Sequence, residues 1–559
     1  MPNLQLSGKA MSNTSTINQN QVVDVAIIGG GVSGAYTAWR LAKSKKDLKV
    51  CLYELSDRIG GRLLSVPVPD MPNIYAEFGG MAFSQSQAIV YELAKKLGLK
   101  IVEFSNGEEN DLLYLRNQHL RLKDIKDPSK LPYNLSINER GMTTNELFNY
   151  VVKNVIPNSG DLSVNFFTSS TWKQLRESLK VDGQYLYNIS IWELILKIIS
   201  NEAYEFCLNG GYYYSSISEW NAAQAIEVNM SFSYSGQPWL TIANGYQELP
   251  KTLVAEFEQY GGEVYYKHRL TTFKRHECSE LIELNFIDEN KNSHSPVLAK
   301  HLVLAMPKRS LELLCQHNQN NFLFNNSQFI KNIQTVSADP VYKLFLGYEY
   351  PWWRTVGVRT GASNTDLPMR QCFYFGTEGE QHGSDPTNLN SLMMAIFSDS
   401  RAVSFWKPME YDPSEPKKRP AFQTRSIAPL KTSFLKADGS LYIEPLVASK
   451  HMVQTVQDQL KALHGMQYIP EPYVALYLDW TKDPYGGGWH VWNPYCKPWE
   501  VMKQMRHPVP GTNVYICGDC YSNFQGWVQG ALNSAELMLE ENFHLERPDW
   551  LPDNYDLGT

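Results

Sequence analysis

The stretch Val23–Arg62 reads VDVAIIGGGVSGAYTAWRLAKSKKDLKVCLYELSDRIGGR. A short apolar run, Val23 to Ile28, enters a glycine-rich turn, and an alanine-rich pattern typical of a helix follows from Ala35 to about Ala42. A second apolar run ends on Glu54. This order of strand, glycine turn, helix, strand and acid predicts a unit that binds a dinucleotide.

The glycine turn explains how such a ligand would be held. Gly29 permits the tight turn, Gly31 lets the backbone approach a pyrophosphate, and Gly34 lets helix and strand pack closely, with Ser33 in the same turn. The unpaired N–H groups at the helix start favour an anion. Glu54 stands where a carboxylate accepts both ribose hydroxyls of an adenosine. At this point NAD and FAD both remain open.

Length and composition exclude several classes of protein. With 559 residues, the chain is expected to form two or three domains, and its net charge of −7 gives no reason to expect a nucleic-acid partner. No apolar run is long enough to span a membrane, and the polar residues 1–20 form a predicted mobile tail without the apolar region of a secretory signal. Eight scattered cysteines suit a reducing compartment, so we expect a cytoplasmic protein. The histidines show no metal-ligand spacing, and we expect no metal site.

A second glycine pair follows the nucleotide unit. Gly60 and Gly61 lie between Arg58 and Arg62, whose forked guanidinium groups suit phosphate or flavin oxygens. An early GxGxxG, an acid that ends the second strand, and then RxGGR resemble the signature of the flavin amine oxidases. That family includes L-amino acid oxidases, monoamine and polyamine oxidases, and tryptophan monooxygenases. The resemblance implies FAD rather than NAD.

The resemblance recurs along residues 22 to 545 and implies roles for further residues. A loop beside the flavin ring would contain Gly80 and Met81, and the backbone of Val264 would meet the adenine. Residues 513–519 are similar to the last FAD motif of the family, with Gly518 and the acid Asp519. Residues 526–532 resemble the helix start under the flavin, with Trp527 and Val528. Other similar stretches are residues 244–250 and 301–307.

These motifs divide the chain. We expect an α/β fold with a discontinuous Rossmann-like FAD-binding domain, a mixed-sheet substrate domain and a helical insertion that lines the substrate entrance. The predicted FAD-binding pieces are residues 21–107, 236–329 and 469–545, the helical insertion is 108–235, the substrate domain is 330–468, and 546–559 is a tail.

Oxidation of an amine by a flavin requires a dry pocket that holds the neutral amine with its C–H bond directed at the flavin. Lys343 interrupts an apolar strand. The resemblance implies that this lysine holds a water molecule beside the flavin and assists the reaction of the reduced flavin with oxygen. Trp489 and Trp527 are predicted to form an aromatic cage around the substrate amine. Some relatives carry a cysteine near the position of Trp489 that bonds the flavin covalently, so we expect non-covalent FAD.

One position departs from the amino acid oxidases, which usually carry an arginine after the methionine of the flavin loop. Here that position is Ala82. Either another group binds the substrate carboxylate, with Arg370 and Tyr374 as candidates, or the substrate has no α-carboxylate and the enzyme is an amine oxidase.

We favour an L-amino acid oxidase that uses O2 and releases a keto acid, ammonia and hydrogen peroxide. A decarboxylating monooxygenase and a non-catalytic flavoprotein remain alternatives. The resemblance also suggests a homodimer, with no nucleic-acid or membrane partner.

Overall fold

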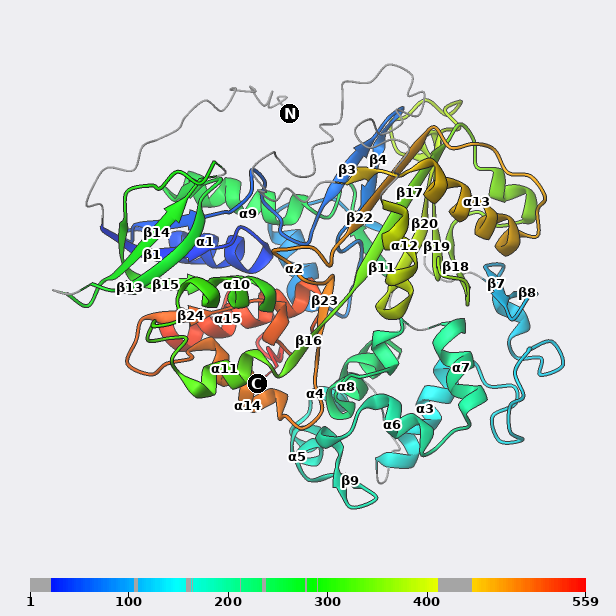
Figure 1. Ribbon diagram of the computed structural model, residues 1–559, viewed down its shortest axis with the longest axis horizontal. Coiled ribbons are helices and arrows are strands. Elements are labelled where there is room, and N and C mark those ends of the chain that lie inside the picture. The colour runs from blue at the N-terminus through cyan, green and yellow to red at the C-terminus, as the bar shows by residue number, and fades with distance from the viewer. Residues whose placement is uncertain are drawn as a thin grey trace.

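A computed structural model describes residues 22–104, 109–156, 162, 164–211, 213–233, 238–276, 279–288, 290–410 and 445–558. The predicted tail at residues 1–20 lies outside this part of the chain. The described residues form a sheet with flanking helices, a second sheet beside it, and a helical unit below the second sheet in the view of Figure 1.

The first sheet has the order β12-β2-β1-β15-β14-β13, and β24 also pairs with β15. Its strands β12, β2, β1, β15 and β24 are parallel, whereas β14 and β13 are antiparallel additions. The strands are β1 (Val22–Ile28), β2 (Val50–Tyr53), β12 (Glu263–Tyr265), β13 (Arg269–Arg275), β14 (Ile282–Ile287), β15 (Val297–Leu304) and β24 (Val514–Ile516). The sheet therefore gathers strands from distant stretches of the chain, as the motif order predicted.

Helices cover the first sheet. They include α1 (Val32–Ser44), α2 (Ala88–Lys96), α9 (Glu248–Gln259), α10 (Lys308–His317), α11 (Ser327–Ile333), α14 (Pro498–Arg506) and α15 (Val528–Phe543). The predicted strand, helix and strand of the opening stretch are confirmed as β1, α1 and β2. With the parallel strands, they form the expected Rossmann-like α/β arrangement.

The second sheet has eight strands in the order β21-β22-β17-β20-β19-β18-β7-β8. They are β7 (Leu112–Leu115), β8 (Gln118–Arg121), β17 (Val341–Tyr348), β18 (Gly361–Thr365), β19 (Gln371–Thr377), β20 (Ser391–Asp399), β21 (Leu446–Val447) and β22 (Val474–Asp479). Helix α13 (Lys450–His464) packs on one face of this sheet, beside the short helix α12 (Val403–Trp406).

The second sheet contains strands from outside the stretch 330–468 that was predicted to form the substrate domain. Strands β7 and β8 fall in the stretch 108–235 predicted as helical, and β22 falls in the stretch 469–545 predicted as FAD-binding. Each completes an edge or an interior position of the second sheet because strand pairing, which is non-local, decides sheet membership.

The helical unit contains α3 (Thr144–Val155), α4 (Val164–Thr168), α5 (Ser170–Ser178), α6 (Ile191–Leu196), α7 (Asn201–Gly210) and α8 (Ala222–Ser233), with the small hairpin β9 (Lys180–Val181) and β10 (Gln184–Tyr185). Shorter pairings join the parts: β3 (Ser65–Val68) with β4 (Met71–Glu77), β11 (Trp239–Ile242) with β5 (Phe83–Ser84) and β6 (Ile101–Glu103), and β16 (Val336–Asp339) with β23 (Trp489–Trp492).

The turn between β1 and α1 depends on two glycines. Gly29 has φ of +111°, which side chains with a Cβ rarely adopt. A Cβ on Gly34 would lie 1.9 Å from the carbonyl oxygen of Gly29. The helix can therefore begin against the end of the strand only because position 34 has no side chain.

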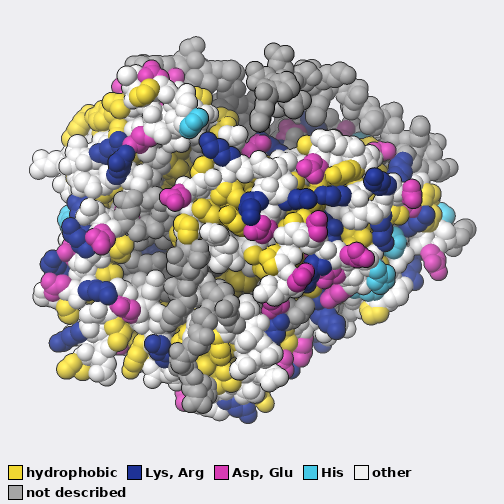
Figure 2. All heavy atoms as spheres, turned by 180° about the vertical axis from the view of Figure 1, so that it is seen from behind, with side chains coloured by type: hydrophobic (Ala, Val, Ile, Leu, Met, Phe, Trp, Pro, Cys, Tyr) yellow, Lys and Arg dark blue, Asp and Glu magenta, His cyan; other side chains and the backbone are white. Residues whose placement is uncertain are grey.

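The surface is mixed in charge. On the face that Figure 2 shows, acidic and basic side chains are interspersed among polar and hydrophobic ones. Among the described residues, no helix is long and apolar enough to cross a membrane.

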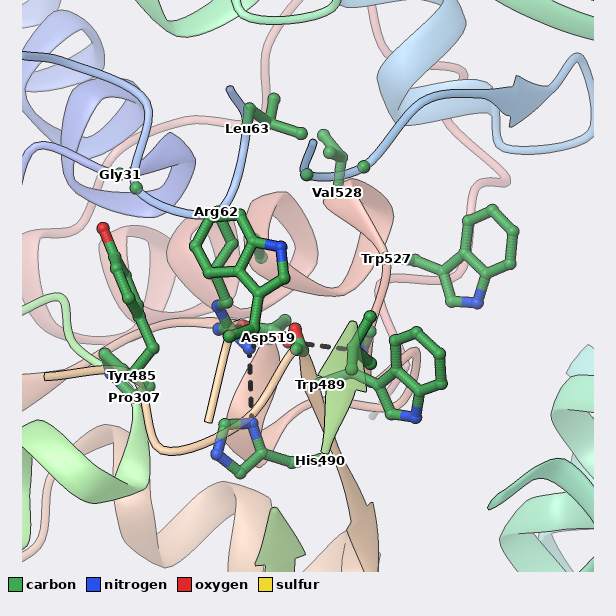
Figure 3. A pocket seen from close by; sticks show the side chains of 18 of the residues that line it. Gly31, Arg62, Leu63, Pro307, Tyr485, Trp489, His490, Asp519, Trp527 and Val528 are labelled. Atoms are coloured by element: carbon green, nitrogen blue, oxygen red, sulfur yellow. Dashed lines mark hydrogen bonds and ion pairs between the residues drawn. The ribbon is translucent and has the colours of Figure 1, made fainter. Parts of the chain in front are cut away.

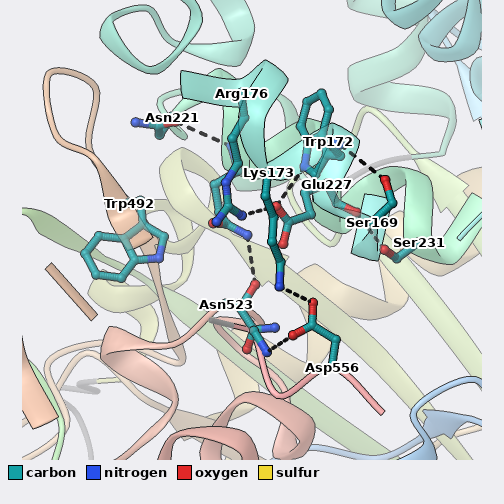
Figure 4. Close-up of polar contacts among 12 residues, drawn as sticks. Ser169, Trp172, Lys173, Arg176, Asn221, Glu227, Ser231, Trp492, Asn523 and Asp556 are labelled. Atoms are coloured by element: carbon teal, nitrogen blue, oxygen red, sulfur yellow. Dashed lines mark hydrogen bonds and ion pairs between the residues drawn. The ribbon is translucent and has the colours of Figure 1, made fainter. Parts of the chain in front are cut away.

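A buried ion pair holds the helical unit together, and a second pair attaches it to the C-terminal residues (Figure 4). Glu227 on α8 accepts hydrogen bonds of 2.9 Å from Arg176 and from the Trp172 indole, both on α5. Lys173 on the same helix pairs with Asp556 at 2.8 Å.

The C-terminal residues are part of the packed fold. Leu551 and Leu557 are each 2% exposed and lie in the core cluster of the first sheet. The prediction that residues 546–559 form a tail is therefore wrong, because these leucines bury apolar area that a free tail would expose to water.

We predict that Glu227→Ala destabilises the protein by about 3–5 kcal/mol, because the charge of Arg176 would stay buried without its partner. The exposed pair of Glu92 and Lys95 provides the control: Glu92→Ala should cost less than about 1 kcal/mol. Denaturant unfolding measures both. Equal losses in the two variants would contradict the importance of the buried pair.

Candidate active site

One large cavity of about 830 Å³ lies where the described parts of the chain meet. Its wall includes the glycine turn after β1, the start of α15, one face of the second sheet and residues of the helical unit. Figure 3 shows part of this wall, with Tyr485 and Pro307 on one side and Trp489 and Trp527 on the other. The volume is at the upper end of the usual range for ligand pockets.

At one end of the cavity, two glycine turns touch. Gly60 donates a backbone hydrogen bond of 2.9 Å to Gly30, and a Cβ on Gly61 would lie 3.1 Å from the Cα of Gly31. Gly29, Gly31, Ser33 and Gly61 line the cavity.

Helix α1 starts at this contact, and its first turn carries no acidic side chain. The free N–H groups of a helix start whose first turn has no acidic side chain form a site for an anion. Gly34 does not line the cavity but makes the close helix–strand contact described above, which was its predicted role.

Glu54, at the end of β2, lies beside this anion site. One of its carboxylate oxygens accepts a 2.6 Å hydrogen bond from the N–H of Gly30, and the other accepts bonds from the N–H and hydroxyl of Ser56. Each oxygen has further lone pairs. The carboxylate is thus oriented along the cavity wall, where it can accept two neighbouring hydroxyl groups.

The two arginines of the RxGGR motif line the cavity, but their guanidinium groups also shape its wall. Arg58 donates to the carbonyl oxygens of Gly61 and Leu63 and so closes the glycine turn. Arg62 forms an ion pair with Asp519 and donates a 3.2 Å bond to the Gly488 carbonyl oxygen. Arg62 therefore connects the first piece of the predicted FAD-binding domain to the last.

A second helix start faces the cavity. Asp519 accepts a 3.2 Å hydrogen bond from the N–H of Gly526, and α15 begins two residues later at Val528. The first turn of α15 contains no acidic residue. Gly518, Asp519, Trp527 and Val528 all line the cavity, so a second anionic group or a ring that gains negative charge would be stabilised here.

Lys343, on β17, is buried at 3% exposure and lies against the predicted flavin loop. Its ammonium donates to the carbonyl oxygens of Glu77 at 3.0 Å and Gly79 at 2.6 Å, and the sulfur of Met81 lies 3.9 Å away. The sulfur is a weak acceptor. The contact with Met81 is therefore the weakest of the three, and a water or substrate oxygen that enters the cavity can replace it.

Burial changes the protonation of this lysine and of the acid beside it. Desolvation lowers the pKa of Lys343 to about 7, and the charge of Glu77 opposes that change. Desolvation also raises the pKa of Glu77 to about 7, against the hydrogen bonds from Tyr246 and Ser65. Both groups therefore titrate near neutral pH.

Aromatic rings surround the remaining space. Trp489 donates its indole N–H to the hydroxyl of Ser215 at 3.0 Å, and its ring lies 5.5 Å from that of Tyr213. Trp527 stacks on Trp239 at 5.7 Å. The predicted residues Gly80, Met81, Ala82, Trp489 and Trp527 all line the cavity.

Two predicted substrate-binding residues lie elsewhere. Tyr374 is 4% exposed, and its hydroxyl bonds to Ser363 and His464 on the α13 side of the second sheet. Arg370 is buried at 3% exposure, donates to the carbonyl oxygens of Leu208 and Thr365, and stacks on Tyr214. Neither lines the cavity. The structure therefore separates both side chains from the position that the carboxylate hypothesis requires.

The cause is the alternation of side chains along β19. Gln371 and Phe373 line the cavity, and Cys372 and Tyr374 lie in the core on the other face. Sequence reasoning missed Gln371 and Phe373 because a change of one residue in the assumed orientation reverses every side chain of a strand.

A further prediction is the contact between the backbone of Val264 and the adenine of the cofactor. Val264 packs among the apolar side chains of the α1 and α9 side and does not line the cavity. Residues 267–270, which follow on the same chain segment, line it instead. The predicted contact between the Val264 backbone and the adenine stays a prediction.

Comparison with protein families agrees with this geometry. Residues 32–537 match the model of the flavin containing amine oxidoreductases. The chain belongs to this family. The family confirms FAD as cofactor and the protein as a flavin-dependent oxidoreductase.

Curated relatives align along almost the whole chain. Aplysianin-A of Aplysia kurodai is 25% identical, covering 94% of this chain and 91% of the relative. Achacin of Lissachatina fulica is 25% identical and covers 93% of each chain. L-amino acid oxidase Bs29 of Bothriechis schlegelii is 24% identical, covering 91% of this chain and 88% of the relative.

The fold also resembles a solved structure. Putrescine oxidase, bound to putrescine, superposes with a TM-score of 0.63 and 16% identity, covering 94% of this chain and 100% of the other. At this identity the likeness confirms the fold alone.

The residues present fit FAD. The two helix starts, the touching glycine turns and the oriented Glu54 supply an anion site and a hydroxyl acceptor along one continuous wall. Lys343 donates to the loop that contains Gly80 and Met81. This loop lines the cavity together with residues of the second sheet.

We predict that Glu54→Ala raises the dissociation constant of FAD by about tenfold or more, because the ribose would lose charge-assisted hydrogen bonds. Glu258→Ala, an exposed change on α9, should leave it unchanged. A titration of the apoprotein with FAD measures the dissociation constant, and FAD released into the supernatant after acid precipitation, per mole of purified protein, measures the content. Full FAD content and unchanged affinity in the Glu54 variant would remove this residue from the cofactor site.

Proposed function

We propose that the protein is an FAD-dependent oxidase that oxidatively deaminates an L-amino acid, with O2 as electron acceptor. The observation that carries this proposal is the buried Lys343, whose ammonium faces an aromatic cavity beside the loop that contains Gly80 and Met81. Besides Bs29, L-amino acid oxidases of Cerastes cerastes, Crotalus adamanteus, Crotalus atrox and Mus musculus are among the curated relatives, at 22–25% identity.

The positive charges that line the described cavity wall are unevenly placed. Lys267, Arg269 and Lys291 belong to segments of the first sheet, and Arg58 and Arg62 belong to the glycine turn. Lys343 is the only lysine or arginine that the described part of the second sheet adds to the wall. We infer that a substrate carboxylate lies near Lys343, where the ammonium compensates its charge in place of the arginine that Ala82 replaces.

The same charge distribution supports a second candidate. Ala82 provides no cation in the loop, and Arg370 and Tyr374 lie outside the cavity. A substrate without a carboxylate needs no such cation, so it would leave no buried charge without a partner. An amine oxidase is therefore the alternative.

The protein residues position and desolvate the substrate. FAD, when bound, supplies the two-electron chemistry that converts the amine to an imine and O2 to hydrogen peroxide. Water then hydrolyses the imino acid to a keto acid and ammonia. Trp489 and Trp527 exclude bulk water and offer ring faces to the amine. Lys343, when protonated, stabilises negative charge that develops on oxygen.

FAD is proposed to be held non-covalently, since none of the described cysteines lines the cavity. The acid precipitation used for Glu54→Ala tests this point, because a covalent flavin would stay in the pellet. Homodimerisation and a cytoplasmic location stay predictions.

We predict peroxide formation with L-amino acids and little with the amines that lack their α-carboxylate. The reason is that Lys343 would pair with the carboxylate and orient the reacting carbon. A coupled peroxide assay with matched pairs of amino acid and amine measures the ratio of their kcat/KM values. Turnover of the amines alone would overturn the first proposal and establish the alternative. Formation of an amide rather than a keto acid would identify a monooxygenase.

Lys343→Met should slow reoxidation of the reduced flavin by oxygen at least about tenfold, because a positive charge is lost beside the reacting oxygen. In the wild type, the reoxidation rate should fall as pH rises through about 7, since the ammonium loses its proton there. The variant should lose this pH dependence. Stopped-flow absorbance measures both rates, and the exposed change Lys95→Met is the control. Unchanged reoxidation in Lys343→Met would contradict the proposed role.

A further inference from the structure

A single row of residues crosses the second sheet along the floor of the cavity. Strand pairing places Lys343 opposite Phe397, Phe397 opposite Gln371, and Gln371 opposite Asn364. Leu113 on β7 then pairs with Asn364. All five residues line the cavity. The row therefore changes along its length from a cation to an aromatic ring and then to two amides.

The spacing of the row suits a long substrate. Neighbouring strands are about 4.8 Å apart, so Gln371 lies two strands, or about 10 Å, from Lys343. An extended side chain of five bonds of about 1.5 Å reaches about 6 Å, and a hydrogen bond adds about 2.9 Å. A substrate whose reacting carbon lies near Lys343 would thus extend over Phe397 and end at Gln371.

The rings between these ends form an apolar path. The Phe397 ring lies 4.7 Å from the ammonium nitrogen of Lys343 and 6.1 Å from the ring of Phe373. Aliphatic carbon atoms pack well on such faces, and the amides beyond them would meet the end of the side chain.

Gln371 has an unused acceptor. Its side chain is buried, with the residue 7% exposed, and its Oε1 has no hydrogen-bond partner in the part of the chain that the structure describes. A buried polar atom without a partner costs free energy. A donor on the substrate would remove that cost when it binds.

An acid lies next to the same end of the row. Asp111 precedes Leu113 by two residues, lines the cavity and accepts a 3.1 Å hydrogen bond from the N–H of Ala362. Gly361 makes room for it, since a Cβ there would lie 2.7 Å from the Asp111 carboxylate. The carboxylate makes this end of the cavity attractive to donors and cations and repulsive to anions.

We propose that Gln371, together with Asn364 and Asp111, forms the distal end of the substrate site and selects a long side chain that ends in a hydrogen-bond donor. The inference rests on the proposed oxidation of an amino acid for the position of the reacting carbon. Side chains ending in an ammonium or carboxamide fit this end, whereas a terminal carboxylate is repelled.

The test compares two substrates that differ only in the terminal group: L-lysine and its methyl-ended isostere, L-2-aminoheptanoate. In the wild type, kcat/KM should be at least about tenfold higher for L-lysine, since the isostere leaves buried polar groups unpaired. Gln371→Leu should reduce this ratio by about tenfold, mainly through the KM of L-lysine. Gln371→Glu should increase it.

Gln457→Leu is the matched control. Gln457 is a buried glutamine on α13, 2% exposed, outside the cavity. The ratio of the two kcat/KM values should be unchanged in this variant, even if its stability falls. If Gln371→Leu fails to retain FAD, the test rests on Gln371→Glu, in which the ratio of the kcat/KM for L-lysine to that for L-2-aminoheptanoate should increase.

The outcomes separate this inference from the proposed function. If amino acids are not oxidised but amines are, the proposed function fails, and 1,5-diaminopentane against hexylamine tests the distal end by the same ratio. If neither class is oxidised, titrations of the same compounds, followed by flavin absorbance, report their relative binding. A wild-type ratio near one, or an equal ratio in wild type and Gln371→Leu, overturns the inference.

Discussion

The hydrogen bonds from Lys343 to the carbonyl oxygens of Glu77 and Gly79 tie the second sheet to the end of β4 and the loop after it, at the wall of the active-site cavity. The lysine comes from an interior strand of the second sheet, whereas Glu77 ends β4 and Gly79 belongs to the loop that follows it. A buried ammonium requires such partners, because its desolvation would otherwise force it to lose its proton. The position of the loop, and with it the wall of the cavity, therefore depends on a cation that the chain supplies more than 260 residues later.

The cofactor site depends on a similar meeting of distant segments. Arg62 follows the first glycine turn, and Asp519 follows the last strand of the first sheet; their ion pair brings the starts of α1 and α15 to one cavity. Anion binding at each helix start is a local property, but a wall with two such starts exists only after the sheet has formed. The arginines thus build the site as well as line it.

Several features were predictable because they depend on short-range chemistry. The strand, helix and strand of β1, α1 and β2 followed from apolar runs and glycines, and the contact between Gly34 and Gly29 followed from the known need for a glycine there. The orientation of β19 was not predictable. Gln371 faces the cavity and Tyr374 the opposite core because of how β19 pairs with β18 and β20, and register shifts within β19 further obscure the pattern. The packing of the C-terminal residues, which were predicted as a tail, was also missed, although Leu551 and Leu557 are buried.

By itself, the sequence determined the nucleotide-binding unit, because a contiguous strand, glycine turn, helix, strand and acid each have a local physical role. Its resemblance to the flavin amine oxidases selected FAD over NAD and marked Ala82 as the position where relatives carry an arginine. Only the tertiary structure decided which side chains face the substrate. It moved Arg370 and Tyr374 out of the cavity and placed Gln371, Asn364 and Asp111 at its end. The physical reason is that the face of a strand is set by its pairing with neighbours from distant parts of the chain, and a single residue of register exchanges one face for the other.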